Sequence, residues 1–202
     1  MSYGITSDTK ETNFPSPMQP GINDNVKLID VLYEQLSEDK DPLLQIKFED
    51  EFGGQLTETV WPINEDQIAE WNDGEKVHKR NNVSLGIVEG EIVTVEDDIK
   101  MAYATFNQRL LHIASRYMDH EKVQEATKNA RSYAEFCKAY SELFTNELTS
   151  KTPLVRMKVV LNNKDYSILP KFPPFIESMD IPRNHTRLQI TKYDRIERAT
   201  VD

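Results

Sequence analysis

Residues 44–61 read LQIKFEDEFGGQLTETVW, and this stretch decides how the chain folds. Leu44, Ile46 and Phe48 alternate with polar residues, and a second alternating run follows the glycine pair at positions 53 and 54. Alternation with a period of two is typical of strands that bury one face, and glycine supplies the positive φ angles of a tight reversal. The stretch therefore predicts a β-hairpin. The acidic residues of its turn lack the order of a calcium-binding loop, so we interpret them as a solvated turn.

Strand patterns lie on both sides of this hairpin. Residues 24–33 are rich in β-branched and apolar residues, and residues 154–169 read as a second hairpin with its turn at 162–165. Prolines interrupt residues 170–176, which places that segment at a sheet edge or outside the sheet, because proline has no amide hydrogen to donate. Residues 187–193 alternate again and predict a closing strand.

Between the two hairpins the apolar residues recur at helical spacing. From Asp97 onward they stand four and three positions apart, as in an amphipathic helix. Ser132 and Glu135 form the S-x-x-E capping box of a second helix, which we expect to run to about residue 147. A short helix is expected near residues 65–71, within a long connection over 62–94. We expect the aromatic stripe of the two longer helices to pack on the sheet instead of binding a ligand; it comprises Tyr103, Phe106, Leu110, Tyr133, Phe136 and Tyr140.

The composition bounds the class of protein. The chain has 202 residues, of which 38% are hydrophobic and 29% charged, which suits one domain with an ordinary core. No apolar run is long enough to span a membrane, and the first 24 residues lack the pattern of a signal peptide. The single cysteine, Cys137, has no intrachain partner for a disulfide. We therefore expect a reduced, cytoplasmic protein without membrane contact, with a flexible proline-containing arm over residues 1–23 and one domain over 24–202.

The charge is distributed unevenly along the chain. The net charge is -10, yet residues 151–202 hold 10 Lys and Arg against 6 Asp and Glu, whereas residues 1–60 hold 4 against 12. One interpretation is ordinary variation on a solvated surface. The other is a basic strip on an acidic body, which suits an anionic ligand.

Known catalytic and metal-binding motifs are not found. The sequence contains no phosphate-binding loop, no G-x-G-x-x-G, no G-x-S-x-G, no H-E-x-x-H and no C-x-x-C. Asp97 and Asp98 suit the first turn of a helix better than a metal site, and His112 and His120 are too far apart for a shared ligand pair. Cys137 lies in an apolar stripe and is interpreted as packed. We expect a protein that is not an enzyme and uses neither a metal nor a cofactor.

The order of the expected elements indicates a fold. It is a strand, a hairpin, a helical insertion over about 97–147, a second hairpin and a closing strand. Five strands with the main helix between the third and the fourth is the order of the OB-fold, a small, partly open barrel that binds single-stranded nucleic acid or oligosaccharide. We therefore predict an α+β protein with an OB-fold-like five-stranded antiparallel barrel and a large helical insertion between the third and fourth strands.

The chain also resembles the OB-fold single-stranded-DNA-binding proteins that bacteriophages encode for DNA replication and recombination. The resembling stretches are residues 21–28, 44–54, 136–140 and 158–162, with the proline-aromatic segment through Phe175. The resemblance implies a non-catalytic protein that coats single-stranded DNA and has replication or recombination proteins as further partners, in the host cell cytoplasm. Many such proteins end in an acidic tail, whereas residues 195–202 are of mixed charge.

Residues that alternate with the expected core residues supply a candidate binding face. Single-strand binding needs aromatic rings that stack on bases and cations that follow the phosphates. The candidate nucleic-acid-binding residues are Lys47, Trp61, Arg156, Lys158, Tyr166, Lys171 and Phe172. The alternative is that the rings belong to the core and that the cations are merely solvated.

Two other functions stay open at this stage. One is a structural or adaptor protein, of a phage or a bacterium, that holds another protein through the barrel and the helical block. The other is a metal-dependent nuclease, for which only scattered carboxylates argue.

Overall fold

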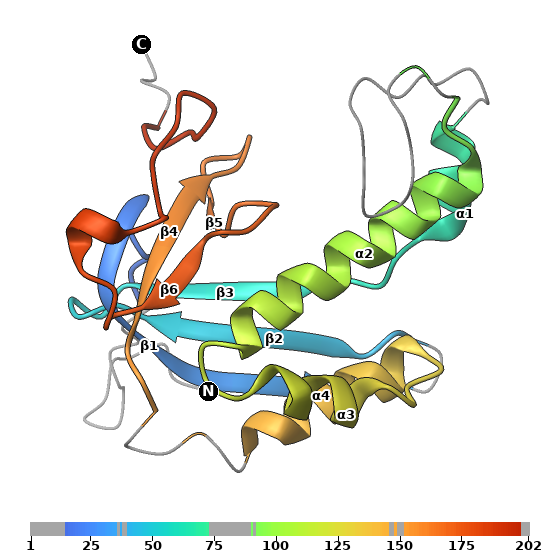
Figure 1. The fold of residues 1–202 in the computed structure, drawn as a ribbon, viewed down its shortest axis with the longest axis horizontal. Coiled ribbons are helices and arrows are strands. Elements are labelled where there is room, and N and C mark those ends of the chain that lie inside the picture. Colours follow the sequence, from blue (N-terminus) through green and yellow to red (C-terminus); the bar gives the residue numbers. More distant parts are fainter. Residues whose placement is uncertain are drawn as a thin grey trace, which may run out of the picture.

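Six strands and four helices make up the part of the chain that the computed structural model describes, which is residues 15–35, 37, 40–72, 90, 92–145, 148 and 152–198 (Figure 1). The strands are β1 Gly21–Glu34, β2 Leu43–Glu49, β3 Gln55–Val60, β4 Val155–Leu161, β5 Ser167–Ile168 and β6 Ile176–Ser178. The helices are α1 Glu65–Trp71, α2 Val95–Ala114, α3 His120–Thr127 and α4 Tyr133–Thr145. The predicted α+β class is confirmed.

The sheet is antiparallel, with strand order β3-β2-β1-β4-β5 and with β6 on β4. The predicted hairpin is confirmed: β2 and β3 pair from Leu44 with Val60 to Glu49 with Gln55. Among the described strands β3 and β5 are the ends of the order; they lie against one another but no ladder joins them. The sheet is therefore not closed into a barrel.

Strand β1 belongs to both halves of the sheet. Its first residues pair with β4, from Gly21 with Val159 to Val26 with Val155, and its later residues pair with β2. The register shifts between Asn23 and Val26, where Asn25 has a φ of 55°. A bulge of this kind bends a strand and increases its twist, which lets one long strand curve around the core.

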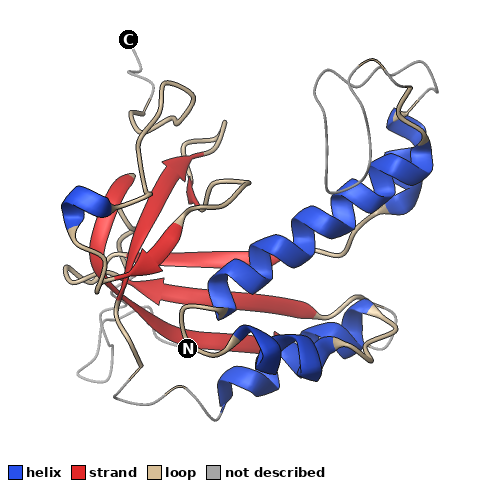
Figure 2. Ribbon diagram, in the orientation of Figure 1, coloured by secondary structure: helices blue, strands red, loops and turns tan. Residues whose placement is uncertain are grey.

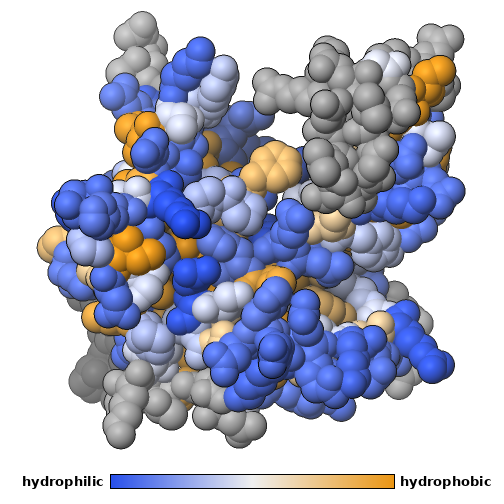
Figure 3. All heavy atoms as spheres, viewed as in Figure 1, coloured by the Kyte–Doolittle hydropathy of each residue, from blue (hydrophilic) through white to orange (hydrophobic). Residues whose placement is uncertain are grey.

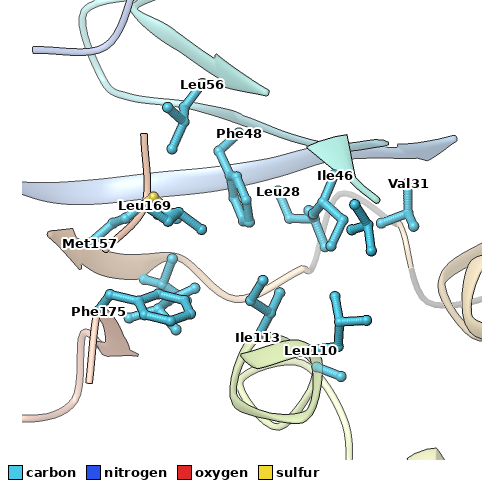
Figure 4. Close-up of a cluster of buried hydrophobic side chains, with 14 of the residues drawn as sticks. Leu28, Val31, Ile46, Phe48, Leu56, Leu110, Ile113, Met157, Leu169 and Phe175 are labelled. Carbon is cyan, nitrogen blue, oxygen red and sulfur yellow. The ribbon is translucent and has the colours of Figure 1, made fainter. Parts of the chain in front are cut away.

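The core lies between the curved sheet and the helical block (Figures 2 and 4). Phe48 and Ile46 of β2, Met157 of β4 and Ile113 of α2 are fully buried there, together with Phe175. Alternating residues of β2 are buried because the period of two turns every second side chain toward the same face.

Polar contacts attach the helical block to the sheet. Ser141 Oγ donates to the carbonyl of Val31 at 3.1 Å, and Tyr133 OH donates to the carbonyl of Val60 at 2.6 Å. Tyr140 is fully buried, in keeping with the expected core role of the aromatic stripe. Tyr103 differs, because it is exposed and its hydroxyl donates to Glu65 of α1 at 2.8 Å.

The helix starts follow from their capping residues. Thr94 Oγ1 accepts from the amide of Asp97 at 3.2 Å, and Asp97 Oδ2 accepts from the amide of Thr94 at 3.0 Å. Ser132 Oγ accepts from the amide of Glu135 at 3.2 Å, as its capping box predicts. The acidic residues at the start of α2 thus stabilise the N-terminus of that helix.

Two expectations on chain ends and one on a turn are wrong. Residues 15–23 are no flexible arm, since Met18 is fully buried and its amide donates to the carbonyl of Gln55 at 2.9 Å. Residues 187–193 form no strand; they are irregular chain that contacts β4, where Lys158 donates to the carbonyl of Gln189. Gly53 has the expected positive φ of 81°, but Gly54 is needed for space: a Cβ there would lie 2.5 Å from Asp50 Oδ2.

Several predicted features lie outside the described residues. They are residues 1–14 of the arm, residues 73–89 of the long connection and the end of the second helix at Glu147. Within the described residues, no helix combines the length and the apolar character that crossing a membrane demands.

Candidate nucleic-acid interface

A cleft of about 1290 Å³ lies beside β3, the strand at one end of the sheet order. Figure 1 shows β5 and the far part of α2, with α1 beside it, rising on either side of this strand. We call it the strand–helix cleft. Its lining includes Thr57, Glu58, Thr59 and Trp61 from β3 and the residue after it, Trp71, Met101, Thr105 and Arg109 from the two helices, and Asn162, Tyr166, Leu169, Lys171 and Phe172 from the β5 side.

Four large aromatic side chains around this cleft are exposed to solvent. Trp61, Trp71, Tyr166 and Phe172 have exposed fractions of 69%, 74%, 65% and 60%. Exposed apolar groups gathered at a concave surface mark an interaction site, because an isolated globule gains nothing from leaving them in water. Figure 3 shows this face of the molecule, where apolar patches lie among polar side chains.

The floor of the cleft is organised by Arg109 of α2. Its Nε and Nη2 donate to Glu58 Oε1 at 2.9 and 2.8 Å, and it also donates to the carbonyls of Leu169, Pro170 and Lys171. Burial raises the pKa of the Glu58 carboxyl, while the guanidinium favours its charged form. One side chain thus connects α2, β3 and the backbone of the segment that carries Lys171.

The β4–β5 turn holds Tyr166 in place. Asn162 Oδ1 accepts from the amides of Lys164 and Tyr166 at 2.8 and 3.0 Å, and Asp165 has a φ of 62°. A side-chain amide that bonds its own turn is typical of tight reversals. The ring therefore projects from an ordered turn.

On the opposite wall, α1 is attached to α2 at both of its ends. The Tyr103 hydroxyl donates to Glu65 at the start of α1, and this bond raises the pKa of Tyr103. Asn72, which follows α1, donates through Nδ2 to Val93 O and to Asp98 Oδ2, each at 3.0 Å. These contacts position Trp71 at the cleft.

The structure brings together four of the seven residues predicted from the sequence. Trp61, Tyr166, Lys171 and Phe172 line the strand–helix cleft, where Lys171 Nζ lies 5.4 Å from the centroid of the Phe172 ring. Lys47 does not line it: it is half-buried on β2, in register with Thr57 of β3. Trp71 was not predicted, although a tryptophan in a short polar helix is itself a signal.

The prediction that Arg156 lies on a binding face is wrong. The side chain is buried, and it donates to Asp24 at 2.6 Å, to Glu177 at 2.7 Å and to the carbonyl of Ile181 at 3.0 Å. Burial opposes ionisation of Asp24 and Glu177, but their hydrogen bonds outweigh it and lower both pKa values.

Lys158 is likewise removed from the proposed face. It is buried and donates to both oxygens of Asp194 at 3.1 Å and to the carbonyl of Gln189 at 3.2 Å. The physical reason is shared with Arg156: every residue of β4 is buried, because residues 179–198 cover the face of β4 that points away from the core. The alternation along β4 predicts which residues share that face, but it does not predict that a later segment covers it.

Two titratable side chains, His112 and Cys137, have pKa values that burial shifts. His112 Nε2 accepts from the amides of Phe175 and Ile176 at 3.3 and 3.4 Å, and burial lowers its pKa to about 4. Burial raises the pKa of the Cys137 thiol to about 11. Within the described ranges no three His, Cys, Asp or Glu side chains are grouped as metal ligands.

A second hollow, of about 680 Å³, lies among α2, α3 and α4, and we call it the helical groove. Its apolar part includes Phe106, Tyr133 and Phe136, whose rings contact one another at centroid distances of 6.5 and 5.3 Å. Among the described lining residues the charged ones are Lys128 and Arg131.

Comparisons with protein-family models, with curated proteins and with solved structures gave no match.

Proposed function

We propose that this protein binds single-stranded DNA in the strand–helix cleft. The observation that carries the proposal is that Trp61, Trp71, Tyr166 and Phe172, contributed by three separate parts of the chain, are all exposed around one cleft. A ring that stacks on a base contributes about 1–3 kcal/mol, and it does so for every base. Such rings need unpaired base faces, so a single strand fits and a duplex does not.

The charges of the cleft are compatible with a polyanion. Among the described lining residues the cations are Arg109 and Lys171 and the carboxylates are Glu58 and Asp98. Glu58 is engaged by Arg109, and Asp98 accepts from Asn72. The carboxylates are thus occupied within the protein, and Lys171 stays exposed beside Phe172.

The fold supports this proposal when the sheet is interpreted as an opened OB-fold. The order β3-β2-β1-β4-β5, with α2 to α4 inserted between β3 and β4, matches the order of the OB barrel. OB domains bind ligands on the face of their second and third strands and on the loop between the fourth and fifth. The strand–helix cleft is lined by β3 and by Asn162 and Tyr166 of the β4–β5 turn.

We further propose a non-catalytic role in coating single strands during phage DNA replication or recombination. This role rests on the resemblance of the chain to phage single-stranded-DNA-binding proteins. The described residues around the cleft support binding without chemistry, since the carboxylates there are engaged in holding the helices and the strand.

The test is a titration with oligothymidine, followed by tryptophan fluorescence. Trp61 and Trp71 line the cleft, so stacking should quench emission, and Trp61→Phe and Trp71→Phe should each remove part of the quench. Duplex DNA of the same length is the control and should leave emission unchanged. A flat titration at low salt, or equal affinity for duplex, would contradict the proposal.

The helical groove favours a second candidate, an adaptor that holds another protein. Phe106, Tyr133 and Phe136 offer an apolar surface, and the described charges lining it are both positive. The occupant with matching chemistry is an acidic amphipathic helix. A labelled acidic amphipathic peptide that binds the wild type but not Phe136→Ala, together with a flat oligothymidine titration, would put this candidate first.

A further inference from the structure

We infer that residues 191–194 form a second platform for the same single strand, beyond the cleft and past the β4–β5 turn. We call them the outer turn. This inference rests on the proposed function and adds a binding site to it. Tyr193 is 85% exposed, and Lys192 Nζ lies 5.0 Å from the centroid of its ring.

The outer turn repeats the chemistry of the cleft. Lys171 and Phe172 form a lysine–aromatic pair at a centroid distance of 5.4 Å, and Lys192 and Tyr193 form another at 5.0 Å. Both rings are exposed, so each pair offers a face for a base beside a cation for a phosphate. The same combination therefore occurs twice on the surface.

Hydrogen bonds within the outer turn and an ion pair to β4 hold its backbone. Asp194 Oδ2 accepts from the amide and hydroxyl of Thr191 at 2.7 and 2.9 Å, and the amide of Asp194 donates to the carbonyl of Thr191 at 3.0 Å. Lys158 anchors the same carboxylate from β4. Binding to a preorganised ring costs little conformational entropy. The exposure of Tyr193 is thus built into the turn.

The outer turn is joined directly to the cleft. Leu161 donates its amide to the carbonyl of Arg195 at 2.7 Å, and Arg195 Nη1 donates to the carbonyl of Asn162 at 2.7 Å. Asn162 lines the cleft and holds Tyr166. Figure 1 shows the outer turn and the β4–β5 turn at the same end of β4. A strand that leaves the cleft at Tyr166 therefore has the outer turn as its neighbour.

The charges along this path favour phosphate. Lys164 at the tip of the β4–β5 turn and Lys192 are exposed. Two carboxylates of these turns are engaged, because Asp165 pairs with Arg195 at 2.5 Å and Asp194 pairs with Lys158. The net charge of the whole chain is -10, but the surface of these two turns presents the exposed lysines Lys164 and Lys192.

The inference predicts that replacing Tyr193 lowers the affinity for a long oligonucleotide but not for a short one. An oligothymidine of about 5 nucleotides fits the cleft alone, whereas one of about 16 reaches the outer turn, given OB-fold site sizes of roughly 4–16 nucleotides. Tyr193→Ala should weaken binding of the long oligonucleotide about tenfold and leave the short one unchanged, and Tyr193→Phe should retain full affinity. Phe52→Ala is the matched control, because Phe52 is 89% exposed in the β2–β3 turn, at the other end of β3 from Trp61.

The outcomes separate this inference from the proposed function. If the wild type binds both oligonucleotides and Tyr193→Ala changes neither, the outer turn is not part of the site and the cleft stands. An equal loss for both lengths would also overturn the inference. If the wild type binds neither, the proposed function has failed. An unchanged Tm for Tyr193→Ala is expected, since an exposed ring contributes little to the core.

Discussion

Arg109 and Glu58 face each other across the floor of the strand–helix cleft, with Nε and Nη2 of the arginine 2.9 and 2.8 Å from one carboxylate oxygen. The pair joins the C-terminal half of α2 to β3, the strand at one end of the sheet order. The same guanidinium also donates to three backbone carbonyls, those of Leu169, Pro170 and Lys171. Arg109 therefore links the helical wall of the cleft to β3 and to the segment that carries Lys171.

Arg109→Ala should both destabilise the protein and weaken DNA binding. Removing one partner of a buried ion pair leaves the other charge uncompensated, at a cost of about 3 kcal/mol. Urea denaturation measures the stability, and Arg198→Ala is the control because Arg198 is exposed. At a temperature where Arg109→Ala is folded, its affinity for oligothymidine should still be lower than that of the wild type. An unchanged affinity would show that Arg109 does not position Lys171 and Phe172.

Arg156→Ala should destabilise the fold strongly and leave the binding mode intact. Arg156 is buried between Asp24 and Glu177, so its loss leaves two carboxylates without their cation, at a cost of about 3–5 kcal/mol. The measurement is the urea midpoint, with Lys138→Ala as the control, because Lys138 is exposed on α4. A normal midpoint together with a shallower salt dependence of DNA binding would restore Arg156 to the binding face.

Stability should fall in acid because of the Arg156 network and of the separate pair between Asp194 and Lys158. The pKa values of Asp24, Glu177 and Asp194 are lowered in the fold, from ordinary values of 3.8, 4.5 and 3.8. The unfolded chain therefore binds protons first, so this stability is fully present above about pH 5 and is lost as the pH falls through the lowered values. Glu177→Gln should flatten the decline in Tm below pH 5, and an unchanged pH profile would show that the network does not govern acid stability.

The sequence predicts those parts of the molecule whose signals are local. The alternation of Leu44, Ile46 and Phe48 gives the hairpin, and Ser132 with Glu135 gives the start of α4, because each depends on residues a few positions apart. Arg156 could not be placed in this way. Its partner Asp24 is 132 residues distant, and alternation carries no information on whether a later segment covers a strand face.

The residues of the cleft likewise divide into those that local sequence patterns predict and those that depend on long-range contacts. Trp61, Tyr166 and Phe172 were found by following the strands and the loop next to them. Trp71 was missed because its place opposite β3 depends on how α1 lies on α2, through Tyr103 with Glu65 and Asn72 with Asp98. Neither of these contacts has a sequence pattern that identifies it.

The last prediction concerns what drives binding by a protein with a net charge of -10. Salt screens the interaction between surface charges beyond about 8 Å at physiological ionic strength. Distant carboxylates therefore do not prevent a contact between a phosphate and a cation in the cleft. Each phosphate contact with a single strand contributes about 0.7 to the log-log salt slope. The described cations that line the cleft are Lys171 and the engaged Arg109, so the slope should be shallow, and Lys171→Ala should reduce it by about 0.7. Replacing Trp61 or Phe172 by leucine should instead lower affinity about five- to 150-fold at every salt concentration, because each stacked base contributes about 1–3 kcal/mol. Titrations at several salt concentrations measure both effects. Affinity that collapses at moderate salt while the leucine variants bind normally would show that phosphate contacts outside the cleft dominate, and would remove stacking as the mechanism.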